Sequence, residues 1–355
     1  MAYEVQDTSL VNLYTLETLR SFTIDFMQGL GATSEEAEII SDGLMTASQW
    51  WHPGQGQGLE KLFRYHRRVK NGGILPNAPM RWISDGPSYA LLDAAKGFGY
   101  VAAHRAMRRA ADKAKTTGIA MVGVRHSNHF GIAGYHAMTA AKQGLIGWSF
   151  TNAAAEMAPW GSAKPILGTN PWGIAIPRDN DHAIVLDMAL TMSGKGMMRW
   201  YEREGREMPD NWALTPAGEI TTDPSAAMDG PMLPIGEYKG YGLSLVTDVL
   251  AGVMTGALFG LDVFQDDRNF DVGHMMVAID PAALLPAEDY NRRLDELVQQ
   301  VKGAPPIDPK RPVLLPGEVE FRRMNDRRRD GIPVSRETVA NLRELAAGID
   351  VEFSL

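Results

Sequence analysis

Some segments of the chain have apolar residues at helical spacing, and others are short apolar runs typical of strands. Together these segments predict an α/β protein. Apolar residues recur at helical spacing in residues 15–28, 34–47, 60–70, 99–117, 191–204, 240–260, 290–301 and 335–347. Short apolar runs that predict strands occupy residues 89–94, 118–125, 172–176, 183–189 and 273–280, with a further strand starting at Leu145. Strands interleaved with helices in this order are typical of a sheet that helices cover.

One turn in the middle of the chain is the first place to look for chemistry. A predicted strand ends at Arg125, a predicted helix opens soon afterwards, and His126, Ser127, Asn128 and His129 lie between them. The turn that follows a strand is where an α/β sheet usually presents side chains to a ligand. We therefore expect an active site at this turn.

Composition narrows the classes of partner. The 355-residue chain is long enough for two domains, or for one large domain with a smaller attachment. A net charge of -8 and a pI near 5.5 argue against a nucleic-acid partner, although local Lys and Arg can still bind a small anion. The absence of cysteine excludes disulfides, thiolate catalysis and cysteine-ligated zinc. No signal peptide and no apolar stretch of membrane-spanning length is found, so we expect a soluble cytoplasmic protein without a membrane partner.

Three catalytic schemes can be compared on these residues. Zinc hydrolysis would need an acid beside His126 and His129, and none lies near them in the sequence, so we expect no metal site. Serine hydrolysis would need G-x-S-x-G, which is absent. The remaining scheme is proton transfer by a histidine beside a buried acid, with a redox cofactor for the hard step. It would use His129, Asp187 from the predicted buried strand at 183–189, and a cation for the substrate.

A loose dinucleotide-binding pattern, G-x-G-x-x-A, occupies residues 97–102. The next predicted strand ends in Val124 and Arg125, where a Rossmann nucleotide site would need an acid for the ribose hydroxyls. We therefore interpret the pattern as a glycine-containing helix start.

Ordered motifs over most of the chain resemble a known family. The motifs are HSNHFGIAGYHA, FTNA, MAPWG, LGTNPWGIAIP, VLDMA, YKGYGL, AIDP, LLPGE and GIPVSRET, and the resemblance runs from about residue 15 to residue 347. The chain thus resembles the malate/L-lactate dehydrogenase type-2 family. That family includes sulfolactate, ureidoglycolate and 2,3-diketogulonate oxidoreductases and reductases of cyclic imino acids.

The resemblance implies a fold and an assembly. It implies a non-Rossmann, mixed-sheet α/β/α domain that binds cofactor and substrate, for which we expect residues 75–284. It also implies a helical domain formed from both chain termini, for which we expect residues 1–74 plus 285–355. Family members assemble as homodimers, so a homodimer is expected here.

The resemblance also implies hydride transfer with NAD or NADP and assigns residues to it. Catalytic roles map onto His129 and Asp187. The cofactor contacts map onto Ala183, Ile184, Val185, Leu186, Asp187, Met188 and Ala189, onto Tyr238 and Lys239, and onto Gly317 and Glu318.

The chain departs from the family at one motif. Relatives carry Ser-His-Gly, then an arginine three residues on and a tyrosine four further. Aligning Lys61 and Tyr65 puts Gln57 at the general-acid histidine and Lys61 at the arginine that clamps the substrate carboxylate; a second alignment gives Gln55 instead. These positions, Gln57, Lys61 and Tyr65, are the predicted substrate contacts. Glutamine can donate a hydrogen bond to a carbonyl but cannot deliver a proton.

Three functions remain open from the sequence. The first is reduction or oxidation of a small anionic 2-oxo or 2-hydroxy acid, with His52 or His129 supplying the proton. The second is reduction of a cyclic imino acid, because an iminium already holds its proton and needs only hydride. The third is a cofactor-binding protein with little or no dehydrogenase activity, which the missing histidine favours and the retained cofactor motifs oppose.

Overall fold

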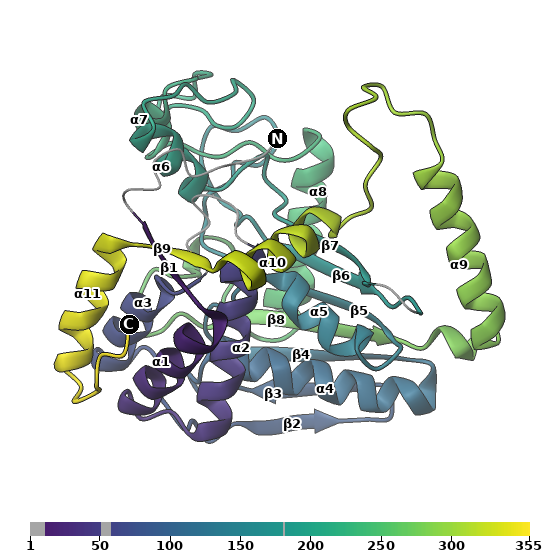
Figure 1. Cartoon of the computed structure of the whole chain (residues 1–355), viewed down its shortest axis with the longest axis horizontal. Helices are drawn as coiled ribbons and strands as arrows, with labels where there is room; N and C mark the ends of the chain where they lie inside the picture. The colour runs from purple at the N-terminus through teal and green to yellow at the C-terminus, as the bar shows by residue number, and fades with distance from the viewer. Residues whose placement is uncertain (1–10, 51–57, 180–181) are drawn as a thin grey trace.

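The computed structural model describes residues 11–50, 58–179 and 182–355 (Figure 1). The strands are β1 (Val11–Tyr14), β2 (Arg81–Asp85), β3 (Tyr89–Asp93), β4 (Ile119–Ser127), β5 (Ile146–Thr151), β6 (Trp172–Ile176), β7 (Ile184–Met188), β8 (Val272–Ile279) and β9 (Ile332–Ser335). The helices are α1 (Leu16–Gly29), α2 (Ser34–Trp50), α3 (Lys61–Lys70), α4 (Gly99–Thr117), α5 (Ala133–Ala141), α6 (Lys195–Arg203), α7 (Pro224–Ala227), α8 (Tyr238–Thr247), α9 (Ala287–Lys302), α10 (Glu318–Asp330) and α11 (Arg336–Ala347). A π-helical segment, η2 (Asp248–Val253), continues α8, and short 3-10 segments lie at η3 (Gly260–Asp262) and η4 (Pro281–Ala283).

A seven-stranded sheet forms the centre of the molecule. Its order is β2-β3-β4-β8-β5-β6-β7, in which β3 and β4 run parallel and every other neighbouring pair is antiparallel. Figure 1 shows α4 and α5 lying across one side of this sheet. The segment η2 packs on the other side through Ala251, beside Phe150 and Met275. The mixed sheet covered by helices confirms the predicted mixed-sheet α/β fold.

The start of α4 explains the G-x-G-x-x-A pattern. A Cβ on Gly99 would overlap the backbone oxygens of Asn128 and His129, and a Cβ on Gly97 would crowd Met80 and Ala78. These glycines let the helix start pack against the turn after β4, so no space for a pyrophosphate remains there. The interpretation as a helix start is confirmed.

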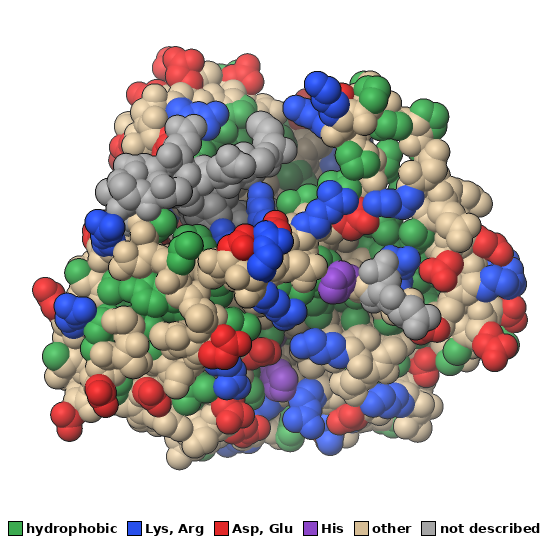
Figure 2. All heavy atoms as spheres, in the orientation of Figure 1, with side chains coloured by type: hydrophobic (Ala, Val, Ile, Leu, Met, Phe, Trp, Pro, Cys, Tyr) green, Lys and Arg blue, Asp and Glu red, His purple; other side chains and the backbone are tan. Residues whose placement is uncertain are grey.

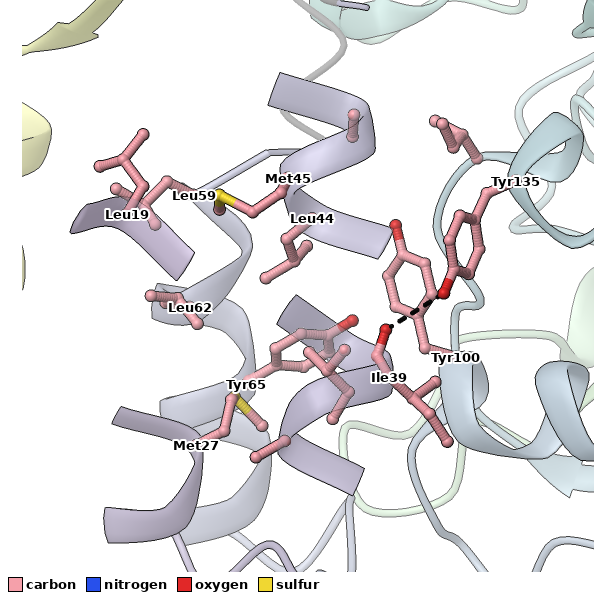
Figure 3. Packing of buried hydrophobic residues seen from close by; sticks show 14 of the residues in the cluster. Leu19, Met27, Ile39, Leu44, Met45, Leu59, Leu62, Tyr65, Tyr100 and Tyr135 are labelled. Carbon is pink, nitrogen blue, oxygen red and sulfur yellow. Dashed lines mark hydrogen bonds between the residues drawn. The ribbon is translucent and has the colours of Figure 1, made fainter. Parts of the chain in front are cut away.

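Both ends of the chain contribute to one packed group of helices. Strand β1 pairs with β9, and α2 contacts α10 while α3 contacts α11. The core of this group is drawn in Figure 3, where Leu19, Leu44 and Leu62 from α1, α2 and α3 converge. This packing supports the proposal of a helical domain built from both termini. Its bounds, and those of the 75–284 domain, stay predictions.

Helix α9 stands apart from that group. Figure 1 shows it projecting at one side of the molecule with a long connection to α10. Its contacts are with the turn after β6, where Arg178 lies 3.6 Å from Asp295 and Asn291 donates to Asp179. Lys302, at its end, pairs with Glu318 at 2.7 Å.

The structure corrects several sequence-based details. Strands β1, β2 and β9 were not predicted, and the basic run at 322–329 is part of α10, where Arg329 pairs with Asp326 and Asp330. The strand at 183–189 was expected to be buried. Instead β7 is the edge of the sheet and Asp187 is exposed. No helix in the described ranges combines the length and the apolar character needed to cross a membrane.

We expect Gly173→Ala to destabilise the fold. A Cβ at Gly173 on β6 would overlap the backbone of Ala133 and Gly134, where α5 begins, and this backbone cannot rotate away. Overpacking of this kind typically costs about 1–3 kcal/mol. Gly242→Ala in α8 is the matched control, because no atom lies within 4 Å of its added Cβ. Thermal unfolding should show a lower midpoint for Gly173→Ala alone; equal midpoints would contradict this packing.

Candidate active site

The turn after β4 is held from both sides. Ser127 Oγ lies 2.9 Å from His274 Nε2, and His274 Nδ1 lies 2.7 Å from Thr151 Oγ1. Asn128 Nδ2 donates to the backbone oxygens of Gly73, Lys96 and Gly97 at 3.1–3.2 Å. The residues on the N-terminal side of His129 are therefore fixed by buried hydrogen bonds.

Phe130 fixes the turn on the C-terminal side of His129. Its ring stacks between His136 and His274, with centroids 4.8 Å from each. Burial lowers the pKa of both imidazoles to about 3, so they are neutral at pH 7. Neutral rings can stack on an apolar face at little cost, and this stack positions the His129 backbone.

His129 itself has a defined tautomer and a cationic environment. Its Nδ1 accepts a hydrogen bond from the Gly131 N–H at 3.0 Å, which leaves the ring proton on Nε2. Burial lowers its pKa well below the ordinary value, and Lys61, Arg68 and Arg64 lower it further. The ring is therefore neutral at pH 7 and presents an N–H donor.

Helix α3 supplies these cations. Lys61, Leu62, Tyr65 and Arg68 are its buried residues, and spacings of four and three residues place Lys61, Tyr65 and Arg68 on one face. Tyr65 packs edge-on against Phe98 at 5.6 Å, next to the α4 start that touches the His129 backbone. The face of α3 is thus brought against the turn of His129.

Lys61 is the most enclosed of these charges. Its side chain is 3% exposed, and burial lowers its pKa well below the ordinary value, with Arg64 and Arg68 adding to the effect and Glu60 opposing it. In the described part of the chain its ammonium has neither a hydrogen bond nor an ion pair. Arg68 differs, because its guanidinium stacks over Phe270 at 3.9 Å. A buried ammonium of this kind is suited to an anionic or polar ligand.

Tyr65, a predicted substrate contact, lies in the helical core. Figure 3 shows its ring between α2 and α3, near Tyr100. Its hydroxyl is buried without a hydrogen-bond partner among the described residues, as is that of Tyr100, and burial raises the pKa of both. Two unsatisfied hydroxyls beside the His129 turn are consistent with a polar ligand or water at this place. The substrate role of Tyr65 stays a prediction.

A second group of charged side chains includes Glu156. The carboxyl of Glu156 is mostly enclosed, and burial raises its pKa against the effect of Lys195, Arg199 and Arg64. Arg64 acts on both Glu156 and His129, so it lies within electrostatic range of both groups. We call Arg64, Glu156, Lys195 and Arg199 the distal charge cluster. Its net charge is positive, which favours a second anionic group on a ligand that reaches His129.

Other candidates are placed as follows. His126 does not face His129's surroundings: its Nδ1 lies 3.0 Å from Asp93 and its backbone N–H donates to Asp271 at 2.6 Å. Asp187 projects beside Gly134, and within the described ranges no hydrogen bond or ion pair joins it to His129. His52, Gln55 and Gln57 lie outside the described residues.

The predicted cofactor segments come together along β7. At its start, the Val185 N–H donates to Pro316 at 3.0 Å, and a Cβ on Gly317 would lie 3.1 Å from Val185. Past its end, the Ile235 N–H donates to Leu190 at 3.0 Å, just before α8 brings in Tyr238 and Lys239. Segments 183–189, 238–239 and 317–318 therefore follow one edge strand.

A pocket of about 150 Å³ lies at the start of β7. It is lined by Arg178, His182, Ala183, Ile184, Leu315, Pro316, Glu318, Phe321, Arg322 and Asn325. Figure 2 shows Lys and Arg side chains gathered over α10 and beside it on this face. Strand backbone, apolar side chains and two arginines meet at this pocket.

Comparison with known proteins identifies the family to which the chain belongs. A family model described as malate/L-lactate dehydrogenase matches residues 14–343. The chain belongs to this family. The malate dehydrogenase of Pyrococcus abyssi is 36% identical over 345 residues, covering 95% of this chain and 94% of the relative.

Solved structures of the malate/L-lactate dehydrogenase family agree. The sulfolactate dehydrogenase of Methanocaldococcus jannaschii has a TM-score of 0.90 at 32% identity and covers 96% of this chain and 98% of its own. The Δ1-piperideine-2-carboxylate reductase of Pseudomonas syringae pvar. tomato has a TM-score of 0.84 at 26% identity, covering 94% and 100%. This member of the family is an oxidoreductase.

Sequence reasoning missed part of this site. Lys195 and Arg199 lie within the helix predicted at 191–204 and were given no role, and Arg64, Arg68 and Glu156 were not singled out. The spacing of Arg64 and Arg68 after Lys61 was a usable signal for Arg68, since helical neighbours share a face. Glu156 follows strand β5 in a long loop, and no local pattern marks it.

Proposed function

We propose that the protein is an NAD(P)-dependent oxidoreductase that transfers hydride between a nicotinamide cofactor and a small 2-oxo or 2-hydroxy acid. The observation that carries this proposal is the face of α3, whose cations Lys61, Arg64 and Arg68 all act on the neutral imidazole of His129 and lower its pKa. Cations bind the acid, and the imidazole N–H can donate to the carbonyl oxygen that becomes negative as hydride arrives.

The cofactor is assigned to the edge of the sheet along β7. Residues 183–189, Tyr238 and Lys239, and Gly317 and Glu318 are the proposed contacts, and the dehydrogenase names of the relatives support a nicotinamide dinucleotide. The bound dinucleotide would supply the hydride. Arg178 and Arg322 offer positive charge to its phosphates at one end of this edge.

The distal charge cluster supports a substrate with two anionic groups. One carboxylate would lie near Lys61, and a second carboxylate or a sulfonate would lie near Arg64 and Arg199. The relatives named for malate and sulfolactate agree with such a substrate. The relative named for Δ1-piperideine-2-carboxylate supports a cyclic imino acid as the second candidate. Roles for Asp187, His52 and Gln57 in binding or proton transfer remain predictions.

We expect oxidation of NADH or NADPH, followed by its absorbance, with oxaloacetate or sulfopyruvate in preference to pyruvate. His129→Ala removes the N–H donor and should lower kcat about 10²- to 10³-fold, as loss of one such donor usually does. Asp112→Ala, at an exposed position on α4, is the control and should leave the rate unchanged. The proposal is wrong if neither dinucleotide binds and no member of the panel, including a cyclic imine carboxylate, is reduced.

We also propose a cytoplasmic homodimer whose partner covers the exposed apolar side chains of α8 and η2. These are Leu245, Val246, Val249 and Val253, each 44–52% exposed and spaced to share a face. A second copy is the expected partner, because symmetric homodimers are the commonest assembly.

Light scattering after gel filtration should give twice the 38.9 kDa of one chain. Changing Val249 and Val253 together to aspartate should yield monomers, because charges cannot be buried in an apolar interface without partners. Leu284→Asp alters a side chain that is 91% exposed before α9 and should leave the dimer intact. A monomeric wild-type protein would refute the proposal.

A further inference from the structure

Reduction of a carbonyl needs a proton on oxygen as well as a hydride on carbon. The described site holds few groups that can release one. His129 is neutral at pH 7, and giving up its remaining N–H would form an imidazolate, which is too basic to be an effective product. Arg64 and Arg68 stay protonated in any aqueous mechanism. Burial raises the pKa of the Tyr65 hydroxyl, which makes it a poorer acid.

Lys61 is the remaining candidate for the proton donor. It occupies the first turn of α3, is 3% exposed, and shares a face with Tyr65 and Arg68. Its ammonium has no polar partner in the described part of the chain, so its N–H groups are available to a ligand. The charged groups that act on it are Arg64, Arg68 and Glu60 of its own helix, and it in turn acts on His129 from the turn after β4.

We propose that Lys61 is the proton donor of the reduction, passing a proton from Nζ to the carbonyl oxygen of the substrate. The inference rests on the proposed function and names the acid within that site. The carbonyl carbon gains the hydride that the reduced cofactor supplies, and the C=O π electrons move to oxygen. That oxygen takes the Nζ proton, forming O–H and breaking N–H. Lys61 is left as a neutral amine, which regains a proton from solvent when the product leaves.

The physical character of the site supports lysine in this role. An ammonium buried among arginines is a stronger acid than one in water, because its charged form loses hydration and is repelled. The lowered pKa of Lys61 brings it nearer to neutral pH, where a general acid is most effective. His129 then donates a hydrogen bond to the same oxygen, and Arg64 retains charge for the substrate carboxylate.

The substitution Lys61→Arg separates proton donation from charge. Arginine keeps the positive charge and can bind a carboxylate, but it does not release a proton. We expect kcat for a 2-oxo acid to fall about 10²- to 10⁴-fold, the usual contribution of a general acid, with little change in KM. Reduction of a cyclic imine carboxylate, assayed where the iminium is protonated, should keep its rate, because the substrate already carries its proton. Lys70→Arg, an exposed lysine at the end of the same helix, is the matched control.

Two further measurements cover the case in which arginine does not fit the buried position. Lys61→Ala should regain 2-oxo acid reduction when methylammonium or ethylammonium is added, with rates that depend on the pKa of the amine. In the wild-type protein, kcat for a 2-oxo acid should fall as pH rises through the lowered pKa of Lys61, and this fall should be missing from Lys61→Ala.

The outcomes distinguish this inference from the proposed function. Lys61→Arg with wild-type kcat on 2-oxo acids, or with equal losses on the oxo acid and the imine, overturns the proton donor and leaves the oxidoreductase standing. A wild-type protein that binds no dinucleotide and reduces no substrate overturns both.

Discussion

The proposed chemistry depends on the ammonium of Lys61, which is buried and forms no ion pair with another described residue. Lys61 and Arg68 are enclosed on one face of α3, and Arg64 of the same helix belongs to the distal charge cluster. Enclosing an ammonium without an ion pair costs free energy, and the proposed ligand would offset that cost by supplying an anion. Such a site would favour small acids, although the chain as a whole carries a net charge of -8.

The rest of the fold holds the His129 turn close to the cations of α3. The His129 turn cannot move away, because Asn128 is bonded to three backbone oxygens and Phe130 is stacked between two histidines. Those two histidines remain neutral through burial, so neither adds a positive charge near His129. On the opposite side, the edge strand β7 collects the three segments proposed to bind the cofactor. The substrate would therefore lie between a helix that supplies charge and a strand that supplies cofactor contacts.

Many of the helices and strands could be predicted from the sequence, because each depends on the spacing of apolar residues within a short segment. Helical spacing predicted α3 and α4, the apolar run predicted β4, and the missing acid after Arg125 showed that Gly97 and Gly99 do not form a nucleotide-binding turn. The prediction of Asp187 as buried was wrong, because an apolar run does not reveal whether its strand is central or at an edge. Strands β1 and β9 were missed, because each has four residues and they pair with each other from opposite ends of the chain.

Only some residues of the candidate site could be predicted from the sequence. The resemblance pointed to Lys61 and His129, yet the environment that makes both unusual arises from contacts between α3 and a turn far along the chain. Arg64 and Glu156 carry no local signal, since an isolated charge in a helix or loop most often lies in solvent. Burial, which shifts the pKa of Lys61 and His129, is a property of the packed structure and has no pattern of its own in the sequence.

The most direct test is the pKa of His129, measured by following its imidazole resonances by NMR as pH is varied in the wild-type protein and in Lys61→Met. If the cations of α3 enclose His129, its ring stays neutral well below pH 6.5 in the wild type, and its pKa rises when Lys61 loses its charge. A His129 that titrates near 6.5, or whose pKa is unchanged in Lys61→Met, would contradict the account.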